Sequence, residues 1–345
     1  MTQKTAIITG ITGQDGAYLT QRMLAEGFRV VGAHRRTSSG SFWRMEELGV
    51  LDHPNLTLAA YDATDPGSVR LLIDRYEPDE IYNFAAQSFV GVSFDQPITT
   101  AEVTGLGAVH VLEAIRLSGA PIKLFQASTS EMFGKVAETP QRETTPFYPR
   151  SPYGAAKVYA HWMAVNYREA HGLHATTAIM FNHESPLRGR EFVTRKITDA
   201  AARIRLGLAD EVRLGNLDAR RDWGFAKEYM DAAYAMMRLD HPDTFVLATG
   251  VQHSVRDFAS LAFAAAGFEL VWNGKGVDET GVDRKSGRTM VRINTDLVRP
   301  AEVDTLLGDA AKARETLDWR PETDLETLAR LMVEADLKRL RPYAG

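Results

Sequence analysis

The glycine-rich turn at residues 9–16 constrains the fold of this chain more than any other feature. An apolar, β-rich run at residues 4–9 leads into it, and residues 16–26 continue with the spacing of a helix. Many loops contain three glycines, but a strand before and a helix after them are typical of a turn that approaches a pyrophosphate at a helix N-terminus. We therefore expect a dinucleotide site. Its predicted cofactor-binding residues in this turn are Gly10, Thr12, Gly13, Gln14, Asp15 and Gly16.

Strands and helices alternate along the first half of the chain. The pattern predicts further strands at residues 29–33, 56–60, 80–83, 123–127 and 175–180, and helices at residues 68–76, at 101–117 and after Pro152. Alternation at this spacing implies right-handed strand–helix–strand units and a parallel sheet. The predicted fold class is α/β: a Rossmann-like doubly wound parallel sheet with a smaller, discontinuous C-terminal substrate domain.

The regular alternation of strands and helices is less clear after Asn182. We expect a helix at residues 192–206, a helix at 223–239 and a strand at 244–248 of the first sheet, a loop at 273–288 and a last helix at 325–340. The predicted cofactor domain is 1–180 plus about 222–257, and the predicted substrate domain is 181–221 plus about 258–345.

Composition limits the class of protein. The chain has 345 residues, 44% hydrophobic and 25% charged, so it can bury a large core. A net charge of −5 disfavours a nucleic-acid partner, which usually meets a basic patch. The chain has no cysteine, which excludes disulfides and thiolate metal sites, and we expect no metal. We identify no signal peptide and no window near the ~20 apolar residues of a membrane span, so we expect a cytoplasmic protein with no membrane partner.

Residues suited to a dinucleotide also follow the next strands. Arg35, Arg36 and Ser38 come after the second strand, where an NAD enzyme usually has Asp or Glu and an NADP enzyme has Arg for the 2′-phosphate. The two guanidinium groups favour NADP, and the alternative is a solvated charged loop. The other predicted cofactor-binding residues at strand ends are Asp62 and Ala63, near the adenine, and Ala85, Ala86, Gln87 and Ser88.

Four residues suit acid/base chemistry on a sugar. Tyr153 and Lys157 are spaced i, i+4 on a predicted helix, so both project from one face. A nearby ammonium lowers a tyrosine pKa, and the phenolate can take a hydroxyl proton as hydride leaves. Thr129, at the end of the fifth strand, can hydrogen-bond the same substrate oxygen. Glu131 is either an exposed loop carboxylate or a second acid/base group, which would suit an internal redox dehydration.

Several sequence motifs resemble those of one protein family. The 10–16 turn, the Thr129-Ser130-Glu131 run and the Tyr153–Lys157 pair together resemble the extended short-chain dehydrogenase/reductases. Longer strings narrow the resemblance to the GDP-mannose 4,6-dehydratase family. Besides the turn itself they are FNHESPLRG from Phe181, FVTRK from Phe192, RDWG from Arg221 and RPAEV from Arg299. The resemblance covers about residues 4–340, nearly the whole chain.

The resemblance implies a tightly held NADP that is reduced and reoxidised in each turnover, a GDP-hexose substrate and a GDP-4-keto-6-deoxy sugar product. It matches Thr129, Glu131 and Tyr153 to catalytic residues, with Lys157 as the partner of Tyr153, and Tyr153 and Lys157 also to cofactor contacts. His183 and Arg188 match further cofactor contacts. The predicted substrate-binding residues are Ser88, Asn182, Val193, Lys196, Arg221, Arg299 and Glu302. For each single cation among them, the alternative is a surface charge.

The resemblance also implies a homodimer or homotetramer, with the loop from Arg35 to Trp43 near an interface. Two features deserve separate mention, one that departs from the family pattern and one region without clear periodicity. Phe89 stands where family members often have His, and residues 274–288 form an irregular region that we expect near the sugar. These features bear on the identity of the GDP sugar and not on the reaction type.

The sequence leads to a mechanistic hypothesis with three alternatives. Tyr153 would take the O4 proton as hydride leaves C4, and Glu131 would remove the C5 proton as water leaves C6. Hydride would then return to C6 and a proton to C5. The alternatives are the same reaction on another GDP sugar such as a GDP-heptose, a nucleotide-sugar epimerase or reductase, and a catalytically silent dinucleotide-binding protein. An epimerase needs no base for elimination, and a silent binder would lack Tyr153, Lys157 or Glu131.

Overall fold

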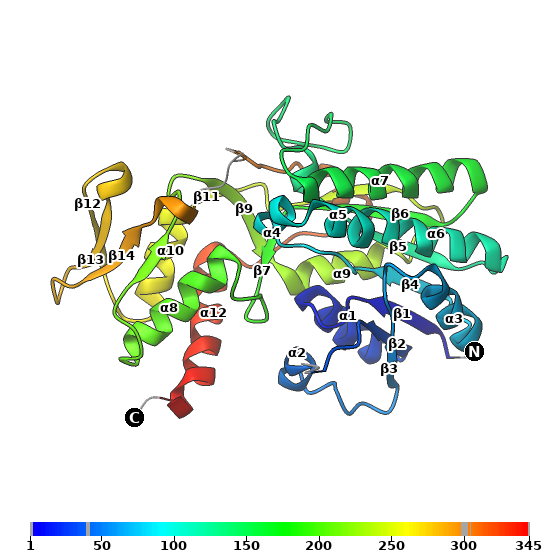
Figure 1. The fold of residues 1–345 in the computed structure, drawn as a ribbon, viewed down its shortest axis with the longest axis horizontal. Helices are drawn as coiled ribbons and strands as arrows, with labels where there is room; N and C mark the ends of the chain where they lie inside the picture. Colours follow the sequence, from blue (N-terminus) through cyan, green and yellow to red (C-terminus); the bar gives the residue numbers. More distant parts are fainter. Residues whose placement is uncertain (1–2, 39–41, 298–302, 304, 344–345) are drawn as a thin grey trace.

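A seven-stranded parallel sheet forms the larger of two lobes in the computed structural model, which describes residues 3–38, 42–297, 303 and 305–343 (Figure 1). Its strands are β1 (Thr5–Thr9), β2 (Arg29–His34), β3 (Leu56–Ala60), β4 (Glu80–Asn83), β5 (Lys123–Thr129), β6 (Ala175–Met180) and β10 (Thr244–Leu247). Their order is β10-β6-β5-β4-β1-β2-β3, and every adjacent pair is parallel. The predicted doubly wound parallel sheet is confirmed.

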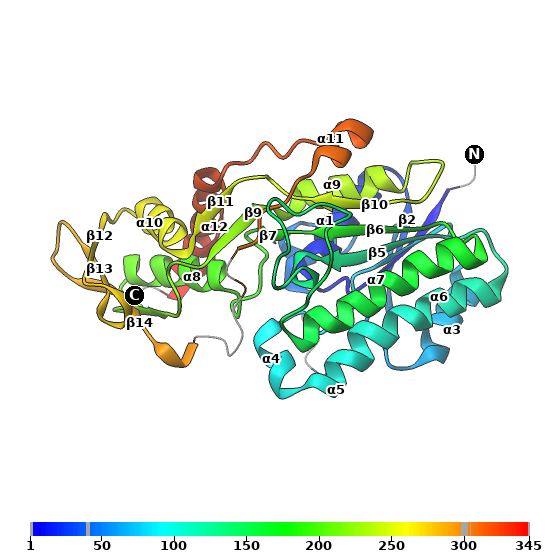
Figure 2. The same ribbon diagram turned by 90° about the horizontal axis from the view of Figure 1, so that it is seen from above.

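Helices cover both faces of this sheet (Figure 2). On one face lie α1 (Gln14–Ala25) and α9 (Ala226–Met236), and on the other α3 (Pro66–Tyr76), α6 (Gly107–Ser118) and α7 (Pro152–His171). Because successive side chains of a strand point to opposite faces, Ile8 packs with the first helix pair and Ile7 with the other set. Burial on both faces explains why the inner parts of β1 and β2 are apolar.

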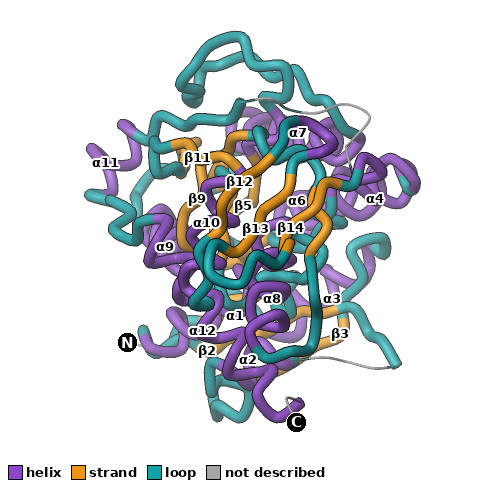
Figure 3. Tube along the Cα trace, turned by 90° about the vertical axis from the view of Figure 1, so that its left-hand side faces the viewer, coloured by secondary structure: helices purple, strands orange, loops and turns teal. Residues whose placement is uncertain are grey.

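The smaller lobe combines three helices with a second sheet (Figure 3). The helices are α8 (Val193–Arg205), α10 (Val255–Ala265) and α12 (Leu325–Leu340). The sheet has the order β12-β13-β14-β8, with β8 (Val212–Leu214), β12 (Leu270–Asn273), β13 (Thr280–Asp283) and β14 (Thr289–Ile293). Apolar side chains from these helices and strands share one core. A third sheet runs between the lobes and consists of β7 (Asn182–Glu184), β9 (Arg220–Phe225) and β11 (Gln252–Ser254).

Short elements join these parts. They are α2 (Trp43–Glu47), α4 (Val90–Asp95), α5 (Pro97–Thr100), the π-helix Ala101–Leu106, the 3-10 turns Ser130–Met132, Gly276–Asp278, Thr295–Leu297 and Arg341–Tyr343, and α11 (Ala311–Leu317). Helix α11 belongs to the stretch predicted for the second domain, but it packs on α9 and β10 of the larger lobe. The residue boundaries of the two domains remain a prediction.

The helix expected at residues 223–239 is wrong at its start, because residues 220–225 form β9. The buried Asp222 carboxylate accepts hydrogen bonds from the backbone N–H groups of Thr249, Gly250 and Gly308. These partners are distant in sequence, so the apolar spacing that suggested a helix could not reveal them.

The loop expected at residues 273–288 is also wrong, because β13 lies within it and pairs with both β12 and β14. A Cβ atom on Gly281 would lie 3.0 Å from Val291 Cβ and 3.1 Å from the Trp272 ring, so close packing favours glycine in this strand. The hairpin lies at the far end of the smaller lobe (Figure 1), and residues 274–288 line neither cavity described below. The expected proximity of this region to a sugar is therefore not supported.

The strand order reverses between β1 and β4, whose connections run to opposite sides of the sheet. In open α/β sheets, ligands bind in the crevice beyond the carboxyl ends of the strands at such a point. The turn after β1, the residues after β4 and the end of β5 all reach this crevice. None of the helices in the described part of the chain is both long and apolar enough to cross a membrane.

Candidate active site

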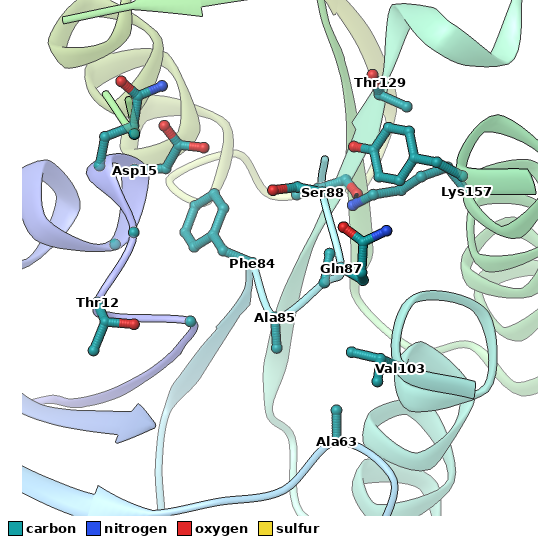
Figure 4. A pocket seen from close by; sticks show the side chains of 18 of the residues that line it. Thr12, Asp15, Ala63, Phe84, Ala85, Gln87, Ser88, Val103, Thr129 and Lys157 are labelled. Carbon is teal, nitrogen blue, oxygen red and sulfur yellow. Dashed lines mark hydrogen bonds between the residues drawn. The ribbon is translucent and has the colours of Figure 1, made fainter. Parts of the chain in front are cut away.

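A cavity of about 670 Å³, here called the first cavity, opens at this crevice (Figure 4). Figure 4 shows Asp15 on one side, Lys157 and Thr129 on the other, and Phe84 and Ser88 between them. The sequence-predicted residues that line it are Gly10, Thr12, Gly13, Gln14, Asp15, Gly16, Arg35, Asp62, Ala63, Ala85, Ala86, Gln87, Ser88, Thr129, Glu131, Tyr153, Lys157, Asn182, His183 and Arg188. Residues separated by up to about half of the chain thus meet at one site.

Arg36 and Ser38 do not line the first cavity. Both side chains are exposed just beyond its edge, in the loop that continues from β2. Their predicted contacts with a 2′-phosphate stay predictions, whereas Arg35 from the same loop does border the cavity.

The glycine-rich turn has the geometry that a dinucleotide pyrophosphate requires. Gly10 has φ +69°, and a Cβ atom there would lie 2.9 Å from the carbonyl carbon of Phe84. A Cβ atom on Gly16 would lie 2.6 Å from the Cα atom of Ile11, so α1 can pack this closely on the turn only with glycine. Gly13 is the N-cap of α1, and no side chain caps the helix. The first N–H groups of α1 are therefore available to an anion at the positive end of the helix.

The junction of β5 and α7 brings the acid/base residues together. Ser151 caps α7 by accepting a hydrogen bond from the backbone N–H of Gly154, and Pro152 occupies the first helical position, where proline is favoured. Tyr153 and Lys157 then lie one turn apart on the buried side of α7. Thr129 ends β5, and its Oγ1 accepts a hydrogen bond of 3.3 Å from the backbone N–H of Glu131.

Burial dominates the protonation of the tyrosine and the lysine. It raises the pKa of Tyr153 well above the ordinary value, and a hydrogen bond from Thr129 opposes this rise. Burial lowers the pKa of Lys157 to about 8, although the charge of Asp15 opposes this shift. The Lys157 Nζ atom lies 5.9 Å from the centre of the Tyr153 ring. The expectation that the ammonium leaves Tyr153 with a lowered pKa is therefore wrong for the protein alone, because desolvation outweighs it.

His183 and Asp15 form a largely buried pair on the wall of the first cavity. The Nδ1 atom of His183 lies 2.7 Å from the carbonyl oxygen of Phe181, and Nε2 lies 3.1 Å from Asp15 Oδ1. Both partners accept hydrogen bonds, so both ring nitrogens carry hydrogen when Asp15 is ionised. Burial opposes charging of either group, but the mutual attraction outweighs it, raising the pKa of His183 and lowering that of Asp15.

A second cavity of about 490 Å³ adjoins the first, between β7, β9 and α8. Glu131, Asn182, Arg188, Glu191 and Phe192 line both cavities. The predicted substrate-binding residues Val193, Lys196 and Arg221 line the second cavity, whereas Ser88 lines only the first. Arg299 and Glu302 lie outside the described residues. Because Glu131 borders both cavities, a ligand that extends from the second into the first would meet its carboxylate.

Sequence reasoning missed several residues that line these cavities. Arg44 and Ser128 border the first, and Phe94, Asn216 and Asp296 border the second. Arg44 follows the Arg35–Ser38 loop as the only basic residue of a short helix, but no pattern in the sequence links it to the glycine-rich turn. Only their placement in space reveals these residues.

Comparisons with known proteins agree with this geometry. The sequence profile of a family described as GDP-mannose 4,6 dehydratase matches residues 7–332. A GDP-mannose 4,6-dehydratase of Sinorhizobium fredii is 50% identical over 344 residues, which cover 98% of each chain. The human GDP-mannose 4,6 dehydratase is 48% identical over 97% of this chain and 92% of its own. Among solved structures, that of RMD from Pseudomonas aeruginosa with NADPH has a TM-score of 0.75 at 22% identity and covers 98% of each chain. This last likeness concerns the fold alone.

Proposed function

The chain belongs to the GDP-mannose 4,6-dehydratase family, and from this premise we propose that it converts GDP-mannose to GDP-4-keto-6-deoxymannose and water with NADP as cofactor. The position of Glu131 carries the proposal. This carboxylate is buried, follows Thr129 by two residues and borders both cavities. A sugar between the cavities would meet Tyr153 and Thr129 on one side and a second acid/base group beside them, as a dehydratase requires.

The first cavity fits a dinucleotide phosphate. The uncapped N-terminus of α1 would hold the pyrophosphate, and Arg35 would face the 2′-phosphate at the adenosine end. Lys157 and Tyr153 would border the nicotinamide end. When bound, NADP would supply the redox chemistry by accepting a hydride from the sugar and later returning one.

The side chains then have distinct tasks. Tyr153 would accept the proton of the C4 hydroxyl, and the hydrogen bond from Thr129 favours its phenolate. The new C4 carbonyl acidifies the neighbouring C5–H bond, so Glu131 can remove that proton and pass a proton to the C6 hydroxyl, which leaves as water. As a hydride returns to C6, C5 would take up one proton, which balances the proton that Tyr153 accepted from the C4 hydroxyl. Lys157 holds a positive charge near Tyr153 and loses it as the pH rises through about 8.

The second cavity fits the nucleoside diphosphate of the substrate. It is bordered by the cations Arg188, Lys196 and Arg221 in a chain whose net charge is −5. Guanidinium and ammonium groups are the usual donors to phosphate oxygens. Phe89 and Phe94 add apolar surface to the same cavity. The position of Phe89 keeps another GDP sugar, such as a GDP-heptose, as the second candidate substrate.

We also propose a homo-oligomer in the cytoplasm. Trp162 and Tyr159 of α7, which are 54% and 45% exposed, and Leu106, which is 45% exposed, place large apolar groups on the surface. Tyr159 lies beside the π-helix that carries Leu106, because a Cβ atom on Gly105 would be 3.4 Å from its ring. Grouped apolar side chains support a subunit interface. The interface predicted at the loop from Arg35 to Trp43 includes residues outside the described ones and stays a prediction.

The reaction is tested by incubating the purified protein with GDP-mannose, with and without added NADP, and measuring the nucleotide sugar by mass spectrometry. We expect a mass loss of one water with no net accumulation of NADPH. A product that keeps its mass while changing its stereochemistry would indicate an epimerase. A product formed with stoichiometric consumption of NADPH would indicate a reductase. GDP-heptose tested in parallel separates the two candidate substrates.

A further inference from the structure

The turn at residues 186–188 is held by arginines from separate helices. Arg195 of α8 donates through one Nη1 atom to the carbonyl oxygens of Pro186, at 2.9 Å, and Arg188, at 2.8 Å. Arg339 of α12 donates to the same Pro186 oxygen at 2.8 Å. These carbonyls lie outside helices and strands, so regular backbone pairing does not satisfy them. The guanidinium groups therefore define the path of the turn.

A third arginine joins this turn to the glycine-rich turn. Arg44 of α2 donates through Nε to the carbonyl oxygen of Leu187 at 2.6 Å and through Nη1 to that of Thr12 at 2.8 Å. The two acceptors are 175 positions apart in the sequence (187 − 12) but lie close together in the fold. Gln14 joins the same two segments, because its Nε2 donates to the carbonyl oxygen of His183 and its Oε1 accepts from Ser185 Oγ. A planar guanidinium presents its donors in a fixed fork, so one side chain can set the distance between two backbone segments. Lysine, with a single ammonium on a flexible stem, cannot reproduce this geometry.

Helix α2 is itself held against the smaller lobe. Three guanidinium groups lie near the Trp43 ring, with their central carbons 4.6 Å (Arg44), 5.2 Å (Arg339) and 5.9 Å (Arg195) from its centre. Glu47 forms an ion pair with Arg339. Cation–π contacts and this ion pair fix the orientation of α2. Arg44 is thus presented to both turns from a rigid support.

The 186–188 turn affects the site because it ends at Arg188, which lines both cavities. The Arg188 guanidinium lies 3.5 Å from the centre of the Phe192 ring, and its Nε atom lies 3.1 Å from Glu184 Oε2. A shift of the Leu187 backbone would move this side chain relative to the first cavity. A shift of Thr12 would move the N-terminus of α1, whose first residues line the same cavity.

We propose that Arg44 is a positioning residue, which holds the glycine-rich turn and the turn before Arg188 at a fixed separation and so keeps the first and second cavities aligned. The proposal rests on the proposed function in taking a nucleoside diphosphate as the ligand of the second cavity. Arg44 contributes through backbone carbonyls and needs no contact with the sugar.

The test compares Arg44→Lys and Arg44→Met with Arg22→Lys. Arg22 is a matched control because it also joins two partners, Glu26 and Asp231, but does so away from both cavities. The affinities for NADPH alone, and for GDP in the presence of saturating NADPH, are measured by calorimetry. The steady-state kcat and KM for GDP-mannose are measured alongside, and circular dichroism with thermal melting reports folding.

We expect each Arg44 variant to bind both NADPH and GDP about tenfold more weakly, as losing one charge-assisted hydrogen bond would suggest, and to raise KM more than it lowers kcat. The Arg22 variant should keep wild-type affinities. Folded Arg44 variants with wild-type affinities for both ligands would overturn the inference. If the wild type binds NADPH but not GDP, the proposed substrate class fails, and the NADPH affinities alone decide the role of Arg44.

Discussion

The Nζ atom of Lys157 lies 2.8 Å from the carbonyl oxygen of Ala127, so the lysine of α7 is tied directly to the strand that ends at Thr129. The same helix and strand are joined again by Ser128 Oγ and His161 Nδ1, which are 2.9 Å apart and buried. These two bonds set the register of α7 on β5. Tyr153 and Thr129 are placed as a consequence of that register.

The burial of Lys157 predicts a pH dependence of stability. Its pKa is about 8 in the folded protein and 10.5 in the unfolded chain, so the unfolded state binds more protons between these values. Stability should therefore rise with pH from about 8 to about 10.5, by at most about 3 kcal/mol for this group. Below pH 8 the full cost of burying the charge is present.

Lys157→Met removes this group and should remove that rise. The measurement is urea unfolding of the cofactor-free protein at several pH values, for the wild type and the variant. We expect the stability of the wild type to increase relative to the variant above pH 8. Parallel stability curves would show that Lys157 titrates normally.

The hydrogen bond from Thr129 predicts the pH profile of the oxidation step. Because it lowers the pKa of Tyr153, Thr129→Val should shift the rising limb of kcat/KM to higher pH. Its rate below that limb should fall by roughly tenfold, while Thr129→Ser should stay close to the wild type. Transient absorbance of reduced cofactor after mixing with GDP-mannose measures the step. An unchanged limb in Thr129→Val would assign the threonine to packing alone.

Glu131→Gln tests the elimination step separately from cofactor binding. The amide cannot accept the C5 proton, so product formation should fall by about 10²- to 10⁴-fold. NADPH affinity should remain close to that of the wild type, since α1 and Lys157 are unchanged. A variant that forms the dehydrated sugar at a near wild-type rate would contradict the assignment of Glu131 as the base.

The parallel sheet was predictable because its signal is local. Each strand is a short apolar run between helices, and the glycine-rich turn occurs where the first strand ends. The strand β9 was not predictable in the same way, because Asp222 is satisfied by backbone groups from residues 249, 250 and 308. A buried carboxylate with distant partners leaves no periodic pattern in its own neighbourhood.

In the candidate site, too, the residues with a local sequence signal were predictable and those with distant partners were not. Tyr153 and Lys157 are one helical turn apart, so their spacing alone placed them on one face of α7. Arg44 touches carbonyl oxygens of Thr12 and Leu187, and carbonyls belong to every residue. A contact with backbone places no demand on the identity of its partner, so no motif could identify Arg44.

A buried ion pair beneath the 186–188 turn gives the last prediction. Arg195 and Asp336 have side chains that are 3% and 1% exposed, and they form a salt bridge of 2.6 Å. Arg195→Met should destabilise the protein by about 3–5 kcal/mol, because it leaves Asp336 buried with its charge less compensated. Burial already raises the pKa of this carboxyl, against the opposing charge of Arg195.

The double variant Arg195→Met with Asp336→Leu distinguishes the stability that comes from the ion pair from the stability that comes from the other contacts of each residue. If charge compensation dominates, the double variant should be more stable than the sum of the two single losses indicates, with a coupling of about 2 kcal/mol or more. It should still be less stable than the wild type, because Arg195 also holds the carbonyls of Pro186 and Arg188. Denaturant unfolding of all four proteins gives the coupling directly, and strictly additive losses would mean that the two charges act independently.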